Sequence, residues 1–197
     1  MRQKPLAANF YSGILAVSHY ETDYITVINL LKSRLLFIAP ILILGSILDR
    51  ITKLWAVNFL QGEPSVSYFS NFIRITYAEN TGAFLGLGYN LPPQVRFWLL
   101  TATVGLFLLG LIVYLFIGKE VDKTSIVSLS LIFTGGFNNF IDRAFNDGAV
   151  VDFLNMGIGS LRTGIFNVAD MYIMAGAALL IVGQFLFERK SRTQEAG

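Results

Sequence analysis

Residues 125–145, SIVSLSLIFTGGFNNFIDRAF, decide the fold: they are apolar for most of their length and end close to Asp142 and Arg143. A helix needs about 20 mainly apolar residues to cross the hydrocarbon core of a bilayer. Ionisable groups in such a helix are costly and therefore point to function. This segment predicts a membrane helix with a functional site at its end.

Three further segments satisfy the same length rule. They are residues 35–57, interrupted by Asp49, Arg50 and Lys53; residues 95–117, with no charge after Arg96; and residues 166–187, with Asp170 in the first turn. The short connection 118–124 makes the two middle helices antiparallel neighbours. The predicted fold is an all-α membrane protein with four transmembrane helices.

The composition agrees with a membrane protein. The 197 residues are 54% hydrophobic and 14% charged, whereas soluble domains carry about 25% charged residues. The net charge of +2 is too small to indicate a nucleic-acid partner. The chain has no cysteine, which excludes disulfides, iron–sulfur clusters and thiolate zinc sites. A Ser-His-Asp triad would need His19, the single histidine, which lies far along the chain from the polar residues described below.

The basic residues predict the orientation. Most of the 15 Lys and Arg lie before residue 35, in the 118–124 connection or after residue 187, whereas loops 58–94 and 146–165 hold only Arg74 and Arg162. Cytoplasmic loops are enriched in Lys and Arg, so both termini should be cytoplasmic. The predicted divisions are a cytoplasmic or interfacial extension at 1–34, favoured over an extra span, a four-helix domain at 35–187 and a tail at 188–197.

The outer loop 58–94 carries a strand pattern. Ile73, Ile75 and Tyr77 alternate with polar residues, the period of a half-buried strand. We expect a small β-rich extracytoplasmic platform on the outer membrane surface, of which residues 68–88 cover the site. The alternative is an ordinary loop whose aromatic residues, among them Phe69 and Phe72, anchor it at the interface.

The segment Asn80-Thr-Gly82 follows this strand. An asparagine amide both donates and accepts hydrogen bonds. Asn80 is therefore the platform's best candidate for holding substrate backbone. The alternative is that it occupies a turn beside Gly82.

Polar residues gather at the same outer edge of the predicted helices. Asn139 and Asp142 are three residues apart and share a helix face, and Arg143 would help to satisfy a carboxylate. The others are Asp152 between apolar neighbours, Asn167 and Asp170 at the start of the last helix, and Asp49 with Lys53 one turn later on the first.

Two carboxyl groups held close together share a proton, so that one activates water and the other polarises a carbonyl. Asparagine side chains orient such carboxylates or donate to an oxyanion. The residues alone leave two other interpretations open, a proton or ion relay and structural capping. Asn167 and Asp170 in particular are residue types favoured at helix starts.

Five motifs occur in order along the four segments: Asp49-x-x-Thr52-Lys53, Asn80-Thr-Gly82, Asn139-x-x-Asp142-Arg143, Val150-Val-Asp-Phe153 and Phe166-Asn-x-Ala-Asp170. This ordered set resembles the lipoprotein signal peptidase (signal peptidase II) family over residues 35–187. The resemblance implies an aspartic endopeptidase of the bacterial inner membrane. Such an enzyme removes signal peptides from prolipoproteins, cutting before a cysteine that carries diacylglycerol.

The resemblance also implies roles for individual residues. Asp152 and Asp170 would be the catalytic pair, near the periplasmic face. Supporting or substrate-binding roles fall to Asp49, Lys53, Asn80, Gly82, Asn139, Asp142, Arg143 and Asn167. No cofactor or metal is expected, and the partners are prolipoprotein substrates and membrane lipids, with the chain a monomer.

The chain departs from the family pattern at Arg50, Glu79 and Asn138, and in its N-terminal extension. These departures bear on substrate preference and on packing of the first helix. Two alternatives belong to other classes: a proton-coupled transporter using Asp142, Asp152 and Asp170, and a non-catalytic membrane paralogue. A magnesium or calcium site of oxygen ligands is a third, smaller alternative.

Overall fold

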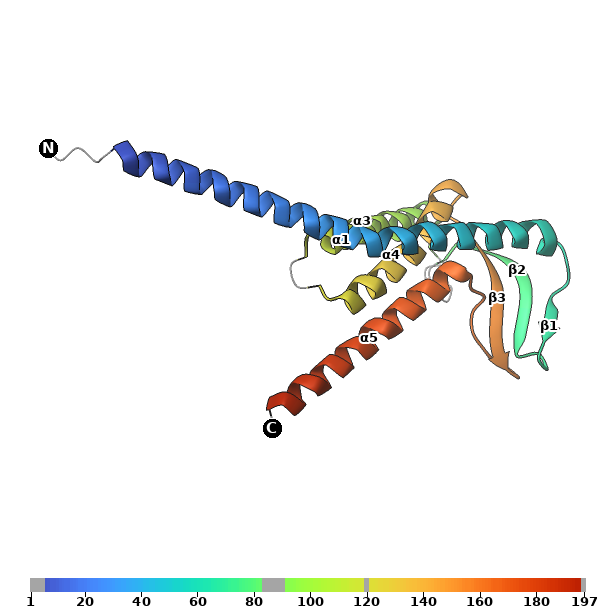
Figure 1. Cartoon of the computed structure of the whole chain (residues 1–197). Coiled ribbons are helices and arrows are strands. Elements are labelled where there is room, and N and C mark those ends of the chain that lie inside the picture. Colours follow the sequence, from blue (N-terminus) through green and yellow to red (C-terminus); the bar gives the residue numbers. More distant parts are fainter. Residues whose placement is uncertain (1–5, 83–90, 119–120, 196–197) are drawn as a thin grey trace.

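The computed structural model describes residues 6–82, 91–118 and 121–195. Most of these residues are helical, and a small antiparallel sheet lies where the first long helix ends and the last begins (Figure 1). The helices are α1 (Leu6–Leu60), α2 (Pro93–Phe97), the π-helix η2 (Trp98–Ala102), α3 (Thr103–Ile117), α4 (Lys123–Phe145) and α5 (Val168–Glu195). The expectation of a mainly helical membrane protein with a small β-rich part is confirmed.

Within the described residues, three helices are long and apolar enough to cross a membrane: Ile25–Leu60, Lys123–Phe145 and Val168–Phe187. They match three of the four predicted spans. The fourth, residues 95–117, is helical throughout, but η2 interrupts it and leaves 15 residues in α3. A straight α-helix of that length is shorter than the bilayer core, so the fourth span stays a prediction.

The structure shows no break in the helix at the predicted boundary after residue 34. The helix α1 continues from Leu6 to Leu60, and the buried guanidinium of Arg34 donates to the carbonyls of Leu115 and Gly118 at the end of α3. A cation is favourable there because the last carbonyls of a helix lack intrahelical partners. Arg34 therefore ties this part of α1 to the end of α3. The division at residue 34 stays a prediction. At the other end, α5 continues to Glu195, beyond the predicted start of the tail.

Close packing of α4 against α5 positions the polar residues. A Cβ atom added to Gly135 would lie 2.2 Å from the carbonyl oxygen of Ala169, and one added to Gly176 would lie 2.5 Å from that of Ser128. Small residues let membrane helices approach this closely. Asn139, one turn after Gly135, thus lies beside the start of α5. An apolar core formed by α1, α3 and α4 supports this pair.

The sheet has the order β1 (Val66–Tyr68), β2 (Ile73–Asn80), β3 (Val150–Ile158) and β4 (Leu161–Arg162). The predicted strand at residues 73–77 is confirmed as β2. The strands β3 and β4 come from the second outer loop, for which the sequence predicted no strand. All neighbouring strands are antiparallel.

Two features position β3, one toward the helix α1 and one toward the strand β2. Phe153 packs against Ala56 and Leu60 at the end of α1, and its ring meets that of Trp55 edge to face with centroids 6.2 Å apart. The pairing of β2 with β3 shifts register between Ile75 and Ala78, next to Asp152. Such bulges redirect side chains beside functional sites.

Candidate active site

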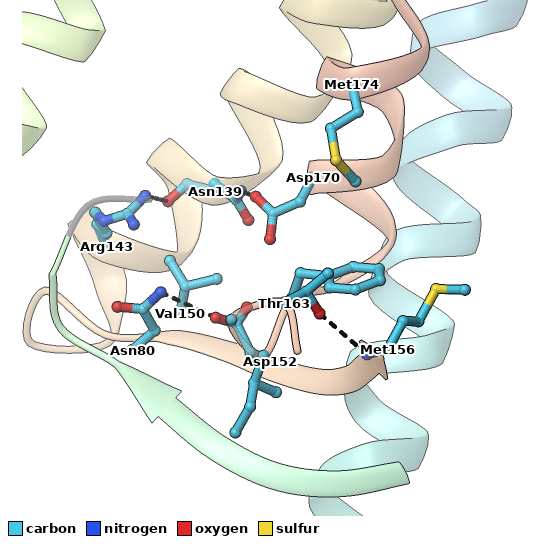
Figure 2. A pocket seen from close by; sticks show the side chains of 12 residues that line it. Asn80, Asn139, Arg143, Val150, Asp152, Met156, Thr163, Asp170 and Met174 are labelled. Atoms are coloured by element: carbon cyan, nitrogen blue, oxygen red, sulfur yellow. Dashed lines mark hydrogen bonds between the residues drawn. The ribbon is translucent and has the colours of Figure 1, made fainter. Parts of the chain in front are cut away.

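A cavity of about 360 Å³ lies between the sheet, the end of α4 and the start of α5. Asp152 enters it from β3 and Asp170 from α5, and Figure 2 shows the two carboxyl groups facing the same space. Its other polar lining residues are Asn80, Asn139, Arg143 and Thr163, and its apolar wall includes Val150, Met156, Ile165, Phe166 and Met174. The two predicted catalytic carboxylates therefore share one cavity.

Asp152 is 1% exposed and is held by two side-chain amides. Asn80 donates to its Oδ2 at 3.0 Å, and Asn167 donates to its Oδ1 at 2.7 Å. Burial, and next the charge of Asp170, raise the pKa of Asp152 to about 7, against the opposing effect of the two amides. A carboxyl group with such a pKa exchanges protons near neutral pH.

Asp170 forms a reciprocal cap with Asn167 at the start of α5. The backbone N–H of Asp170 donates to Asn167 Oδ1 at 3.0 Å, and that of Asn167 donates to Asp170 Oδ2 at 3.1 Å. This is the pattern of a capping box, so the capping interpretation is confirmed for these two residues. It does not exclude a site, because Asp170 Oδ1 accepts from the Asn139 amide at 2.8 Å and the residue borders the cavity.

Lys53 fixes the orientation of Asn139. Its ammonium, on a side chain 2% exposed, lies 3.1 Å from Asn139 Oδ1, which also accepts from the Asn167 amide at 3.1 Å. With its oxygen held by two donors, Asn139 presents its amide nitrogen to Asp170. Lys53 therefore acts on the carboxylate pair through Asn139.

Two buried carboxylates neutralise Lys53. Asp49 Oδ2 lies 2.8 Å and Asp142 Oδ2 lies 2.6 Å from its Nζ. Asp49 Oδ1 also accepts from the backbone N–H of Ala169, which ties α1 to the first turn of α5. A buried charge without a partner is strongly destabilising, so these three groups form one structural unit behind the cavity.

Arg143 was expected to help satisfy a carboxylate. Among the described residues, the cations that contact Asp142 are Lys53 and, at 3.7 Å, Arg50. The guanidinium of Arg143 interacts with Asp170, Asp152 and Asp142 through its charge, without direct contact. Adjacent residues on a helix point in different directions, and Arg143 instead donates to the carbonyl of Gly82 at 2.9 Å and that of Asn139 at 3.4 Å. It therefore links the segment after β2 to α4.

The expectations for the platform are met in part. Asn80 Oδ1 accepts from the backbone N–H of Gly82 at 3.0 Å, so Asn80 does occupy a turn, while its amide binds Asp152. Phe69 and Phe72 do not line the cavity but lie exposed at the far end of the sheet. The expected cover at residues 68–88 lies partly outside the described residues, which exclude 83–90.

The three departures from the family pattern make their contacts away from the carboxylate pair. Arg50 lies at Asp142, and Glu79 accepts from the hydroxyl of Tyr77 at 2.7 Å. Asn138 donates to Ser46 Oγ at 3.0 Å and so joins α4 to α1. None of these contacts reaches Asp152 or Asp170.

Sequence reasoning missed the apolar wall of the cavity. Met174 follows Asp170 by one helical turn, and helical spacing would have placed it on the same face. Met156, Thr163 and Ile165 carried no such signal. Met156 lies on β3, and backbone hydrogen bonds from Thr163 to Met156 and from Phe166 to Leu154 hold the segment after β4 beside it.

Membrane helices together with a cavity bordered by two carboxylates agree with a membrane-bound enzyme, the class that the sequence predicts. Two solved structures, each described as a bacterial membrane enzyme, are similar in fold. One has a TM-score of 0.66 and 27% identity, covering 79% of this chain and 90% of the other. The second has a TM-score of 0.65 and 26% identity, covering 75% and 91%.

The chain belongs to the signal peptidase II family, whose model matches residues 41–186. It is similar to the lipoprotein signal peptidase of Borreliella afzelii, with 36% identity over 73% of this chain and 86% of that protein. The enzyme of Clostridium tetani is 37% identical over 72% and 88%, and that of Borrelia hermsii is 32% identical over 83% and 98%. The chain is thus a membrane protease of a bacterial family that removes signal peptides from prolipoproteins.

Proposed function

We propose that this protein is an aspartic endopeptidase in which Asp152 and Asp170 perform the cleavage. The observation that carries the proposal is that the two carboxylates border one cavity, each held by an asparagine amide. The pKa of Asp152, raised to about 7 in part by the charge of Asp170, supports a pair that shares one proton. A relay would use the same carboxylates, but the family is one of proteases.

The raised pKa of Asp152 assigns the role of acid to this residue and leaves the role of base to Asp170. Asp170, as the carboxylate, takes a proton from the water that attacks the scissile carbonyl carbon. Asp152, as the acid, gives its proton to the carbonyl oxygen, and a tetrahedral diol forms. When the diol collapses, the C–N bond breaks, a proton passes to the leaving nitrogen, and the pair again holds one proton.

The asparagines hold the carboxylates without exchanging protons. Asn167 contacts both members of the pair and Asn139 contacts Asp170, while Lys53 fixes Asn139 from behind. Groups held in this way need little reorganisation when charge moves in the transition state. The apolar wall, with Met156 and Met174, would receive apolar side chains of the signal peptide.

We further propose the substrate and the setting. The substrate is a prolipoprotein whose cysteine carries diacylglycerol, and the cut falls just before that cysteine. Its acyl chains keep the scissile bond near the outer surface of the inner membrane. With both termini cytoplasmic, the cavity lies at the same level. In this arrangement the protein is a monomer, its helices make four passes and both termini are cytoplasmic.

The test is incubation of the purified protein with a diacylglyceryl-modified prolipoprotein and, in parallel, with the same prolipoprotein unmodified. We expect release of the signal peptide, followed by gel shift, from the modified substrate only, and equal release in excess chelator. Equal cleavage of both substrates would contradict the proposed specificity. No cleavage of either would favour the non-catalytic paralogue, and loss of cleavage in chelator would point to a metal site.

A further inference from the structure

Two turns at the far end of the sheet, here called the sheet tips, expose large apolar side chains. The first turn joins β1 to β2 and carries Phe69, which is 78% exposed; the second joins β3 to β4 and carries Ile158, 78% exposed, and Leu161, 83% exposed. In Figure 1 the turn between β1 and β2 and the end of β3 lie close together, away from the helices. These apolar side chains therefore project from one end of the sheet, where the strands turn.

The sheet tips are held together by hydrogen bonds. The backbone N–H of Gly157 donates to the carbonyl of Phe72 at 2.9 Å. Arg162 Nη1 donates to the carbonyl of Asn71 at 2.7 Å, and its Nε donates to the side chain of Asn155. The exposed apolar residues are thus presented by one connected unit.

The first tip also has an unusual backbone. Phe69, Ser70 and Asn71 have φ angles of 52°, 52° and 69°, in the left-handed region that non-glycine residues rarely adopt. Asn71 Oδ1 accepts from Ser67 and, at 3.2 Å, from Arg74, which stabilises the turn. Backbone strain of this kind concentrates at functional sites, and here it places Phe69 outward.

The charge around the sheet tips has one sign. Residues 64–78 and 153–169 contain Arg74 and Arg162 but no Asp or Glu. Apolar and aromatic side chains next to basic groups are the combination that binds the interface of a bilayer, where phosphates are negative. The sheet lies at the end of the helices that we place in the membrane, so a lipid surface is within its reach.

We propose that the sheet tips insert into the outer leaflet of the membrane that the helices cross. Phe69, Ile158 and Leu161 enter the boundary between head groups and acyl chains, and the two arginines lie at the level of the phosphates. The sheet is then attached at two places, to the helices through Phe153 and to the lipid through its tips. This holds β3, and with it Asp152, at a constant depth. The proposal rests on the proposed orientation but not on the cleavage reaction.

The natural absence of cysteine allows a direct measurement of depth. Single-cysteine variants Phe69→Cys, Ile158→Cys and Leu161→Cys receive a nitroxide label, and the full chain is reconstituted into vesicles of phosphatidylethanolamine and phosphatidylglycerol. Power saturation compares oxygen, which concentrates in lipid, with a water-soluble nickel chelate. The matched control is Glu79→Cys, on an exposed position of β2 near the helices.

We expect a ratio of oxygen to nickel accessibility that is several-fold higher at the three tip positions than at Glu79. Three tip sites keep the measurement meaningful if one variant fails to fold, as judged by gel filtration. Equal nickel accessibility at the tips and at the control would overturn the proposal. Protection of the labels from the nickel chelate that appears only after other membrane proteins are added would also overturn the proposal, and it would indicate a protein partner. The depth measurement does not require an active enzyme. Its failure can therefore be distinguished from a failure of the proposed cleavage reaction.

Discussion

Replacing Asn80 by alanine should change the pH dependence of cleavage. The Asn80 amide donates to Asp152 Oδ2 at 3.0 Å and, by stabilising the charged carboxylate, lowers its pKa. As the proposed acid, Asp152 must be protonated, so activity is present below its pKa of about 7 and is lost as the pH rises through that value. Removing the amide raises the pKa and moves the alkaline limb of the profile to higher pH.

The size of the change follows from the bonds around Asp152. A hydrogen bond to a charged group contributes about 1.5–3 kcal/mol, and about 1.4 kcal/mol corresponds to one pH unit. Asn167 still donates to Oδ1 in the variant, so the loss should lie near the lower end of this energy range. We therefore expect the alkaline limb of the profile to move up by about one pH unit. The same variant loses the turn that Asn80 makes with Gly82, so KM should also rise.

The assay is kcat/KM on a fluorescent lipopeptide from acid to alkaline pH. Glu79→Gln is the matched control, because it alters the adjacent, exposed residue of β2, which contacts Tyr77 instead of Asp152. Its alkaline limb should stay in place. An alkaline limb in Asn80→Ala that is unmoved, or moved to lower pH, would refute the assignment of Asp152 as the acid.

Three other predictions concern the surroundings of the site. Lys53→Met leaves buried Asp49 without its cation and Asp142 with only the more distant Arg50. It should lower the free energy of unfolding by about 3–5 kcal/mol, measured by tryptophan fluorescence on heating, and an unchanged midpoint would contradict the role given to this ammonium. Arg143→Ala frees the segment at Gly82 and should raise KM more than it lowers kcat, in steady-state kinetics, whereas a loss confined to kcat would count against a positioning role. A topology reporter fused after Gly197 should be cytoplasmic, and one inserted at Glu63 should be periplasmic. The reverse pattern would place the cavity on the wrong side of the membrane for exported substrates.

Local patterns made part of the fold predictable. The apolar run at 125–145 corresponds to α4, and the alternation at 73–77 corresponds to β2. The strand β3 was not predicted because both of its faces carry buried residues, among them the polar Asp152 and Asn155, so apolar and polar residues do not alternate. Its partner β2 also lies far away in the chain. The alternation in β2 therefore predicted one strand of this pair, but nothing in either segment predicted that the two would pair.

The polar residues of the site could be predicted from the sequence for a different reason. Carboxylates and amides are costly at the edge of a bilayer, so Asp152, Asp170 and Asn139 stood out among apolar residues. Their contacts were not predictable, because Lys53 reaches Asp142 across the packing of α1 against α4. Helix packing of this kind depends on the close approach at glycines such as Gly135, which the sequence shows only as composition.

The central claim is tested most directly by cleavage of the diacylglyceryl-modified prolipoprotein by Asp152→Asn and Asp170→Asn. Each amide has nearly the shape of the carboxyl group but cannot exchange its proton, so we expect each variant to lose at least ~10³-fold in rate. Membrane levels and thermal stability should stay near those of the unaltered protein. Near-normal cleavage by either variant, or an inactive Asp142→Asn beside an active Asp152→Asn, would contradict the assignment of this pair.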